Sequence, residues 1–348
     1  MTADKVATIP DLTPATTGRI SAQKDFTVDG STITFPLVLT PGEPEPETQT
    51  TAFTSTDAVV DWIERNQTKL VQLAQVHGAI LLRGFCPPIS RPVDFDAVCK
   101  AFGLESFPYI GGAAPRTVIT RSVFTANESP ADQLIPFHHE MAQSKSHPGV
   151  LFFYCMKPPI EGGQTPIVLS NLVYERIKGE FPDFVAELEE KGVRYVRILP
   201  KEDDPSSAIG RGWKSTFAVQ RKQDAERVAR RTGMEVEWLE DELLKTTTEV
   251  IPATKKDPRT GKTSWFNSIV AAFTGWKDQR NDPRKAVVLG DGSPLDANIL
   301  GRCLEIMDEL AVSFDWKRGD VLMVDNWVTL HSRNTFRGER VVYASLWK

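Results

Sequence analysis

Two histidines and a glutamate stand together in the sequence Pro136-Phe-His-His-Glu-Met141. Successive side chains of a β-strand point to opposite faces, so His138 and Glu140 are predicted to share one face and His139 to point away from it. An imidazole and a carboxylate would then converge on one point, as metal ligands do. The pattern is weak alone, because five histidines and 46 acidic residues in 348 produce about 0.7 such pairs by chance. Taken alone, the segment is interpreted more simply as a surface strand with a solvated histidine and glutamate.

A third histidine ends the segment Gly319-Asp-Val-Leu-Met-Val-Asp-Asn-Trp-Val-Thr-Leu-His331, which is predicted to form a strand followed by a turn. With His138 and Glu140 it would complete two histidines and one carboxylate. That set binds non-haem Fe(II) on one side and leaves coordination positions open for chemistry. Zinc more often takes a closed set of ligands or a set of cysteines and histidines. His77 and His147 lack such neighbours and are predicted to be structural.

An arginine and a threonine stand where they would suit a dicarboxylate co-substrate. Arg340 follows His331 at the start of an apolar strand, and its guanidinium can bind a carboxylate through two parallel hydrogen bonds. Thr165 ends Gly162-Gly-Gln-Thr165, where two glycines permit a tight turn and the hydroxyl can reach the same carboxylate. Singly, Arg340 would be a surface charge and the glycines a hairpin turn. Together with the three candidate ligands, they indicate an iron oxygenase that uses 2-oxoglutarate.

Strand-like segments predominate in the middle and at the end of the chain. Strands are predicted at 79–85, 150–156, 165–169, 193–199, 321–324 and 341–346, and helices at 57–77, 93–102, 172–191, 223–233, 236–245 and 296–312. Because the two types do not alternate strictly, the pattern favours a mainly β fold of the α+β class, an antiparallel core with helices added. Residues 1–56 are rich in Thr, Pro and Glu, which predicts a loosely ordered arm with one strand at 33–39.

Composition excludes several classes of protein. The net charge of −5 provides no global positive field to hold nucleic acid or an anionic membrane, and no apolar run approaches the length of a membrane span. A small-molecule partner is therefore expected, while the oligomeric state is left open. Four well-separated cysteines, Cys86, Cys99, Cys155 and Cys303, suggest neither a zinc site nor a disulfide framework. With no signal-like N-terminus, the cytoplasm is the expected location.

Longer blocks of sequence resemble the Fe(II)/2-oxoglutarate dioxygenases of the taurine dioxygenase (TauD/TfdA) and clavaminate synthase type, most closely the plant clavaminate synthase-like proteins. The resemblance runs from residue 79 to 348. The blocks that carry it are Ala79-Ile-Leu-Leu-Arg-Gly-Phe85, Tyr109-Ile-Gly-Gly-Ala-Ala-Pro-Arg116, Phe124-Thr-Ala-Asn-Glu-Ser-Pro130, the segment 136–143, Gly210-Arg-Gly-Trp-Lys-Ser-Thr-Phe217, Trp265-Phe-Asn-Ser268 and Gly319-Asp-Val-Leu322.

The resemblance implies a double-stranded β-helix (jelly roll) in a single domain over 57–348, with a long insertion at about 170–318. It implies His138, Glu140 and His331 as iron ligands, and Thr165 and Arg340 as partners of 2-oxoglutarate. The implied reaction uses O₂ to attack a C–H bond of a small, amino-acid-derived substrate by hydroxylation, desaturation or oxidative cyclisation, and releases succinate and CO₂. The alternatives are a cupin-like binding protein without catalysis and a zinc hydrolase that uses the same three ligands.

Two positions refine this expectation. The family's second arginine, which grips an anionic substrate group, is here Ala344, so taurine is not expected to be a substrate. Glu140 fills a position that halogenases of this fold leave small, which disfavours halogenation. Another cation would have to meet a substrate carboxylate. The candidates for the substrate site are Arg121 and, in the segment 210–214, Arg211, Trp213 and Lys214.

Overall fold

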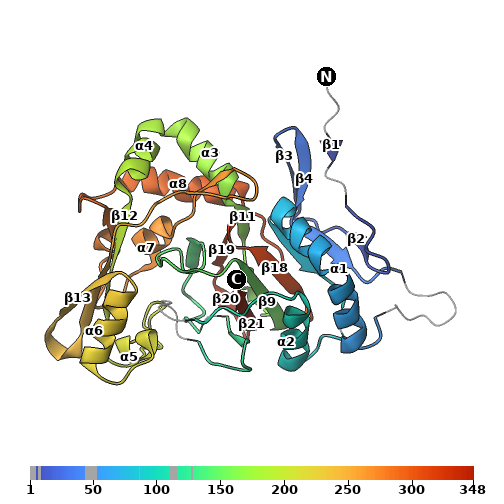
Figure 1. The fold of residues 1–348 in the computed structure, drawn as a ribbon, viewed down its shortest axis with the longest axis horizontal. Coiled ribbons are helices and arrows are strands. Elements are labelled where there is room, and N and C mark those ends of the chain that lie inside the picture. The colour runs from blue at the N-terminus through green and yellow to red at the C-terminus, as the bar shows by residue number, and fades with distance from the viewer. Residues whose placement is uncertain (1–4, 7–8, 44–52, 86, 110–115, 127) are drawn as a thin grey trace.

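Two mostly antiparallel β-sheets face each other at the centre of the molecule (Figure 1). The computed structural model describes residues 5–6, 9–43, 53–85, 87–109, 116–126 and 128–348. The larger sheet has the strand order β2 (Thr16–Gly18), β5 (Leu37–Thr40), β6 (Ala79–Leu82), β18 (Val321–Asp325), β9 (Val150–Lys157), β21 (Val341–Trp347) and β7 (Phe124–Thr125). The smaller sheet has the order β11 (Ile167–Leu169), β19 (Thr329–Arg333) and β8 (Ile135–His138). The mixture of sheets and helices agrees with the predicted class.

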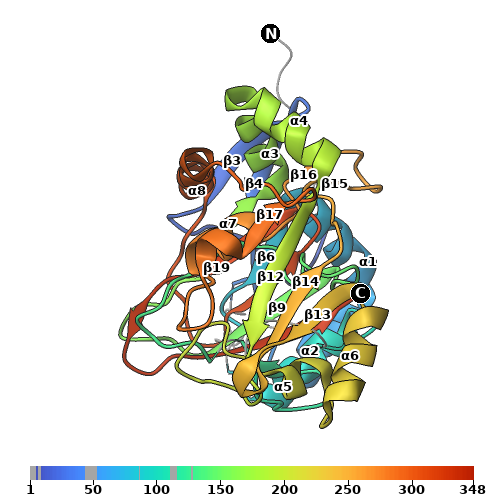
Figure 2. The same ribbon diagram turned by 90° about the vertical axis from the view of Figure 1, so that its left-hand side faces the viewer.

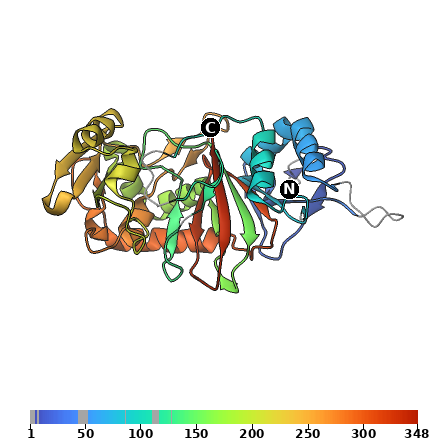
Figure 3. The ribbon, with the colours of Figure 1, turned by 90° about the horizontal axis from the view of Figure 1, so that it is seen from below.

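Strand β9 shows how the sequence produces these layers. Phe152 and Tyr154 pack toward helices α1 (Thr56–His77) and α2 (Pro92–Ala101), whereas Phe153 and Cys155 lie between the two sheets. A strand buried on both faces needs apolar side chains at every position, and residues 150–155 supply them. Seen from below, the central strands lie between these two helices on one side and the insertion on the other (Figure 3).

Helix α1 begins and ends where the sequence predicts. The Ser55 hydroxyl accepts a hydrogen bond from the Ala58 amide at 3.2 Å and caps the first turn. Gly78 ends the helix with φ = 73°, a conformation in which a side chain would clash with Leu169 and Thr329. Strand β6 follows at once and pairs with β18.

The prediction of a loosely ordered N-terminal arm is wrong for residues 9–43. Strand β5 lies inside the larger sheet, and Leu37 and Leu39 are at most 2% exposed. The Trp62 indole N–H donates to the Leu12 carbonyl at 2.8 Å, which fixes the chain onto α1. Strands β1 (Lys5–Val6), β3 (Lys24–Val28) and β4 (Ser31–Phe35) form a small third sheet. The apolar run 33–39 outweighs the polar composition around it. The Pro- and Glu-rich residues 44–52 lie outside the described residues.

The insertion forms a separate four-stranded sheet flanked by helices (Figure 2). Its strand order is β13 (Met234–Trp238), β14 (Leu244–Thr248), β12 (Val193–Leu199) and β17 (Val287–Leu289). Its α-helices are α3 (Ser170–Glu180), α4 (Pro182–Lys191), α5 (Trp213–Phe217), α6 (Lys222–Arg231), α7 (Ile269–Gly275) and α8 (Ala297–Leu310). Short elements complete the fold, namely β10 (Glu161–Gly162), η1 (Glu240–Glu242), β15 (Lys255–Lys256), β16 (Thr263–Ser264), η2 (Pro283–Lys285) and β20 (Phe336–Arg337).

One predicted helix is wrong. Residues 236–245 belong to β13, a turn and β14, which pair as an antiparallel hairpin. The burial of both strands alternates with a period of two, and strand β13 of the hairpin packs on helix α6. Tertiary packing of a β-type pattern therefore overrides the helix propensity of the glutamates and leucines.

Two further expectations concern membranes and cysteines. In the described parts of the chain, no helix is long and apolar enough to cross a bilayer. Cys99, Cys155 and Cys303 are buried and free, and Cys86 lies outside the described residues.

Candidate active site

The pairing of β8 with β19 brings the three candidate metal ligands together. His138 and His331 are direct partners across the two strands, and their ring centroids lie 4.3 Å apart. One ligand atom from each of His138, Glu140 and His331 lies within 4.8 Å of the others. His331 Nε2 is 3.8 Å from Glu140 Oε2, too far for a direct hydrogen bond. The cluster can therefore surround an ion without rearrangement of the backbone.

The protonation of the two histidines suits metal binding. His138 Nδ1 lies 2.8 Å from the Pro136 carbonyl, which only accepts, so Nδ1 carries the proton and Nε2 keeps a lone pair. Burial lowers the pKa of His138 and lowers the pKa of His331 further, aided by the neighbouring His138. Both rings are thus neutral near pH 7, the form that coordinates metal ions.

Asn326, in the turn between β18 and β19, fixes the position of the glutamate. Its side-chain oxygen accepts from the Glu140 amide at 2.9 Å, and its side-chain N–H₂ donates to the carbonyls of Glu140 and Pro148 at 3.1 and 2.8 Å. His139 Nδ1 donates to the Asn326 carbonyl at 2.7 Å, and its ring stacks on Phe266. His139 therefore points away from the ligand cluster, as predicted.

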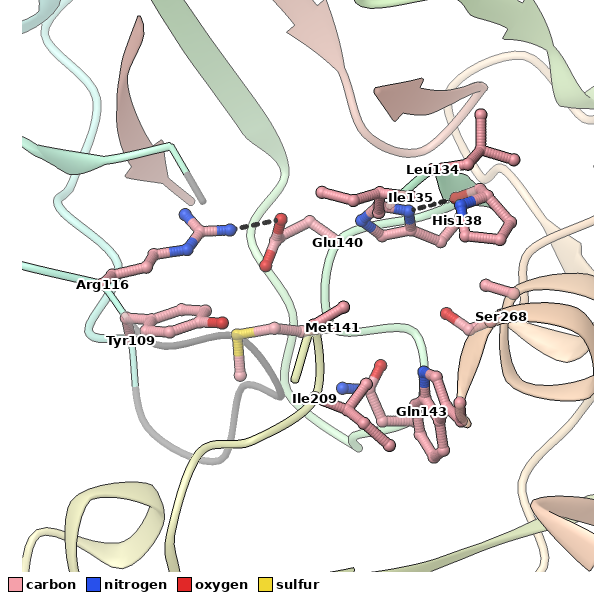
Figure 4. Close-up of a pocket in the computed structure, with 15 residues that line it drawn as sticks. Tyr109, Arg116, Leu134, Ile135, His138, Glu140, Met141, Gln143, Ile209 and Ser268 are labelled. Atoms are coloured by element: carbon pink, nitrogen blue, oxygen red, sulfur yellow. Dashed lines mark hydrogen bonds and ion pairs between the residues drawn. The ribbon is translucent and has the colours of Figure 1, made fainter. Parts of the chain in front are cut away.

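A buried arginine faces the same carboxylate. Arg116 Nη2 donates to Glu140 Oε2 at 2.9 Å, and both side chains are 6% exposed (Figure 4). The Arg116 guanidinium also lies over the Tyr109 ring at 4.3 Å, and Arg211 lies over that ring at 4.8 Å. Burial opposes the charge of Arg116, but the Glu140 carboxylate outweighs it and raises the pKa of the guanidinium. Arg116 Nε and Nη1 have no hydrogen-bond partner among the described residues.

Thr165 and Arg340 meet on the other side of the cluster. Arg340 Nη2 donates to Thr165 Oγ1 at 3.3 Å, and Arg340 Nε donates to the Gly163 carbonyl at 2.8 Å. Gly163 has φ = 67°, and a Cβ there would lie 2.9 Å from Arg340 Cδ, so glycine lets the arginine approach. Burial and the nearby Arg333 lower the pKa of Arg340 to about 10. Within the described chain, no carboxylate forms an ion pair with Arg340.

Two cavities border the ligand cluster. We call them the main pocket, of about 610 Å³, and the arginine pocket, of about 400 Å³. Both are lined by Arg116, His138 and Glu140. The arginine pocket also contains Phe153, Thr165, His331, Arg333 and Arg340. The main pocket continues over Tyr109, Leu134, Ile135, Met141, Gln143, Ile209, Ser268 and Trp276. The cluster thus lies between a cavity lined by three arginines and one lined by a mixture of apolar and polar side chains with one arginine.

The structure brings only one of the four predicted substrate residues near these pockets. Arg211 lies behind Tyr109, which lines the main pocket. Trp213 is buried in the insertion, where its N–H donates to the Glu242 carbonyl at 3.0 Å. Lys214 pairs with Glu202 at 2.5 Å, and Arg121 is exposed on the surface. Trp213 and Lys214 line neither pocket, because the segment 213–217 folds as a helix whose tryptophan packs inward, and Arg121 does not line either pocket.

Sequence reasoning missed several residues of the site. Arg116 and Tyr109 lie at the two ends of a block that signalled the resemblance but was given no role. Arg333 is two residues after His331 and reaches the arginine pocket from the same strand, an alternation that the sequence could have shown. Asn326 carries no sequence signal for its role, because its bonds depend on how two distant turns meet.

Comparison with known proteins decides the family. Residues 44–346 match the family described as taurine catabolism dioxygenase TauD, TfdA family. This chain belongs to the TauD/TfdA family. A clavaminate synthase-like protein from Arabidopsis thaliana is 52% identical over 317 residues, which cover 90% of this chain and 94% of that protein. The dapdiamide synthesis protein DdaC from Enterobacter agglomerans is 29% identical over 281 residues, with coverage of 77% and 82%.

Solved structures support the fold. The PvcB protein from Pseudomonas aeruginosa aligns with a TM-score of 0.50 at 16% identity, over 94% of this chain and 92% of that one. The chain is therefore an Fe(II)- and 2-oxoglutarate-dependent dioxygenase that uses O₂, as the resemblance implied, and His138, Glu140 and His331 form a candidate iron site.

Proposed function

We propose that His138, Glu140 and His331 hold the iron of this dioxygenase. The residues fit the ion: two neutral imidazoles and one carboxylate converge from one side, and the two cavities occupy the other sides. The single observation that carries the proposal is this cluster's position between the main pocket and a cavity whose Arg340 has no carboxylate partner among the described residues. With iron bound, 2-oxoglutarate and O₂ supply the oxidising power that breaks a substrate C–H bond and yields succinate and CO₂.

The arginine pocket would hold 2-oxoglutarate. Thr165 Oγ1 already accepts hydrogen bonds from Arg340 and from the Trp316 N–H at 3.2 Å, so its own O–H is left to donate. A carboxylate would accept from Thr165 and from the Arg340 guanidinium together, and would neutralise a charge that the described residues leave unpaired. Arg333 adds a second positive charge to the pocket, although its N–H groups donate to three backbone carbonyls.

The main pocket would hold the substrate. Its mixture of apolar and polar walls suits a small molecule. Arg116, directed at Glu140 from the pocket wall, would orient the carboxylate ligand and exclude bulk water from it. We infer an amino-acid-derived substrate that is hydroxylated, desaturated or cyclised, because the cationic wall around Tyr109 suits a carboxylate. Ala344, which is fully buried in β21, offers no positive charge to a sulfonate. Taurine is therefore expected not to stimulate turnover.

Three further expectations, about the core fold, the alternative functions and the cellular location, belong with this proposal. The two facing sheets would form the double-stranded β-helix of the family, with residues 170–318 as its insertion. Membership of a dioxygenase family favours oxidation over a cupin-like binding protein or a zinc hydrolase. A cytoplasmic location stays a prediction from the sequence.

The test combines iron content with succinate release. Purified protein should bind one Fe(II) per chain anaerobically and form succinate only with 2-oxoglutarate and O₂. The variant His331→Ala should lose both properties. His139→Asn is the matched control, because its amide can still donate to the Asn326 carbonyl and the side chain lies outside the cluster. Normal iron content and turnover in His331→Ala would refute the ligand assignment.

A further inference from the structure

A third cavity, which we call the side chamber, adjoins the main pocket inside the insertion. It shares Gln143 and Trp276 with the main pocket. Its wall is the inward face of β12 and β14, whose place in the insertion is visible in Figure 2. Hydroxyl groups of Thr216, Thr246 and Thr248 line it beside apolar side chains. A ligand in the main pocket could therefore extend between Gln143 and Trp276 into this chamber.

Arg197 is the only charged residue among the described residues that line this chamber. It stands on the inward face of β12, where burial alternates along the strand, between the buried Tyr195 and Leu199. Arg197 is only 7% exposed. A leucine would satisfy the packing pattern at this position, so an arginine requires another reason.

The guanidinium lacks a partner of opposite charge. Its one hydrogen bond to a described residue is a long one of 3.5 Å, from Nη2 to Thr216 Oγ1, and it lies 6.0 Å from the Trp276 ring. The nearby Asp278 is already bound by Arg280 at 2.8 Å. Burial lowers the pKa of Arg197 to about 10, which leaves the group charged near pH 7.

Arg194 provides a contrast on the same strand. It points to the opposite face, pairs with Glu235 at 2.6 Å and donates to the Thr248 carbonyl at 2.9 Å. The chain thus supplies a carboxylate to the arginine that faces solvent and none to the one that faces the chamber. A buried charge without a counter-ion is unfavourable, so a protein retains it where a ligand brings the counter-ion.

We propose that Arg197 binds a carboxylate of the substrate, at the end remote from the C–H bond that reacts. The inference rests on the proposed function, because it places the substrate in the main pocket. One unpaired guanidinium matches one negative charge, and its planar fork with the Thr216 hydroxyl suits a carboxylate. This arrangement would supply the anion contact that Ala344 does not.

The test uses sodium propionate, a small carboxylate with a short apolar tail. The holoprotein is held anaerobically with Fe(II) and saturating 2-oxoglutarate, so that Arg340 is occupied. Thermal unfolding is then followed against propionate, with sodium chloride at equal ionic strength as reference. Propionate should raise the melting temperature of wild type. In Arg197→Met the propionate concentration for half the effect should rise roughly thirty-fold or more.

Three comparisons make the result decisive. Arg194→Met should respond as wild type does, and Arg197→Lys should keep part of the response. If propionate raised the melting temperatures of wild type and Arg197→Met equally, propionate would be an adventitious additive only, and the proposal would be overturned. A lower melting temperature of Arg197→Met without propionate, with an unchanged response, would show a structural role instead. Inorganic phosphate that binds through Arg197 more tightly than propionate would overturn the choice of a carboxylate. Absence of iron binding or succinate release in wild type would refute the proposed function alone.

Discussion

The two facing sheets and the insertion contribute different sides of the site. The sheets supply His138, His331, Thr165 and Arg340, all on or beside strands whose register is set by backbone pairing. The insertion supplies Ile209, Ser268, Trp276 and Arg197, which reach the pockets through the packing of helices and a separate sheet. All five histidines lie outside residues 170–318. The sheets therefore hold the groups for the common chemistry, and the insertion shapes the space for a particular substrate.

The largest effect is expected at the sheet side, in Arg340→Leu. Removing the guanidinium takes away the charged partner of the 2-oxoglutarate carboxylate in a buried pocket. Truncating such a pair costs about 2–5 kcal/mol, or roughly thirty-fold to several thousand-fold in the KM for 2-oxoglutarate. Iron content should stay normal.

The matched control for that variant is Arg337→Leu, three residues earlier. Arg337 is exposed and bonds to Glu161 on the surface, so its loss should leave the KM for 2-oxoglutarate within about two-fold. Steady-state kinetics with succinate detection measures both variants. Equal KM values for Arg340→Leu and wild type would show that the co-substrate lies elsewhere. The facing sheets would then not be the part of the molecule that binds it.

The next largest effect is expected for Asn326→Ala, which tests whether turn packing positions the metal ligand. The variant loses three buried hydrogen bonds and leaves the Glu140 amide unpaired. The free energy of unfolding should fall by about 3 kcal/mol and Fe(II) affinity by roughly ten- to a hundred-fold. Asn334→Ala, which removes one bond to Gln164, should do neither. Unchanged iron affinity in Asn326→Ala would limit Asn326 to a structural role.

The same division explains what the sequence could predict. His138, Glu140 and His331 were recoverable as candidates because the two-residue spacing suggested the first two and strand pairing brings His331 opposite His138, although β8 ends at His138 and Glu140 lies in the turn after it. The strand predicted at 33–39 covers parts of β4 and β5, but the place of β5 inside the larger sheet was missed, because its neighbours in sequence are polar and its partners in the sheet are distant. The substrate candidates Trp213 and Lys214 line neither the main pocket nor the arginine pocket, because nothing local tells which face of a five-residue helix will be buried. Arg197 was detectable in principle, as a charge on the buried face of an alternating strand.

Acid should destabilise the part of the protein outside the insertion, because all five histidines lie outside residues 170–318. Burial lowers the pKa of all five histidines, to about 3 for His139 and about 4 for His147. Their ordinary value is 6.5, so the unfolded chain binds more protons than the folded one below that pH. The stabilisation is complete above pH 6.5 and is lost as the pH falls toward 4 and 3.

Urea denaturation of the metal-free protein at pH 7.5, 6.5 and 5.5 measures this loss. Each histidine that stays neutral only in the folded state should cost about 1.4 kcal/mol per pH unit below 6.5. The variant His139→Asn should reduce the pH dependence of the unfolding free energy by the contribution of one histidine. If the urea concentration at the unfolding midpoint did not decrease from pH 7.5 to pH 5.5, the proposed neutrality of these rings in the folded protein would be contradicted.

The smallest effect is expected from the Thr165 hydroxyl, and it separates a ligand contact from a structural one. The hydroxyl accepts from Arg340 and Trp316, so its proton is the part left for a ligand carboxylate. Thr165→Ala should raise the KM for 2-oxoglutarate by roughly two- to twelve-fold, the equivalent of one hydrogen bond of about 0.5–1.5 kcal/mol. Thr165→Ser should restore it, because serine keeps the hydroxyl. A purely structural role would instead lower the melting temperature of Thr165→Ala without altering this KM, since the Trp316 N–H would lose its buried acceptor while the ligand lost nothing.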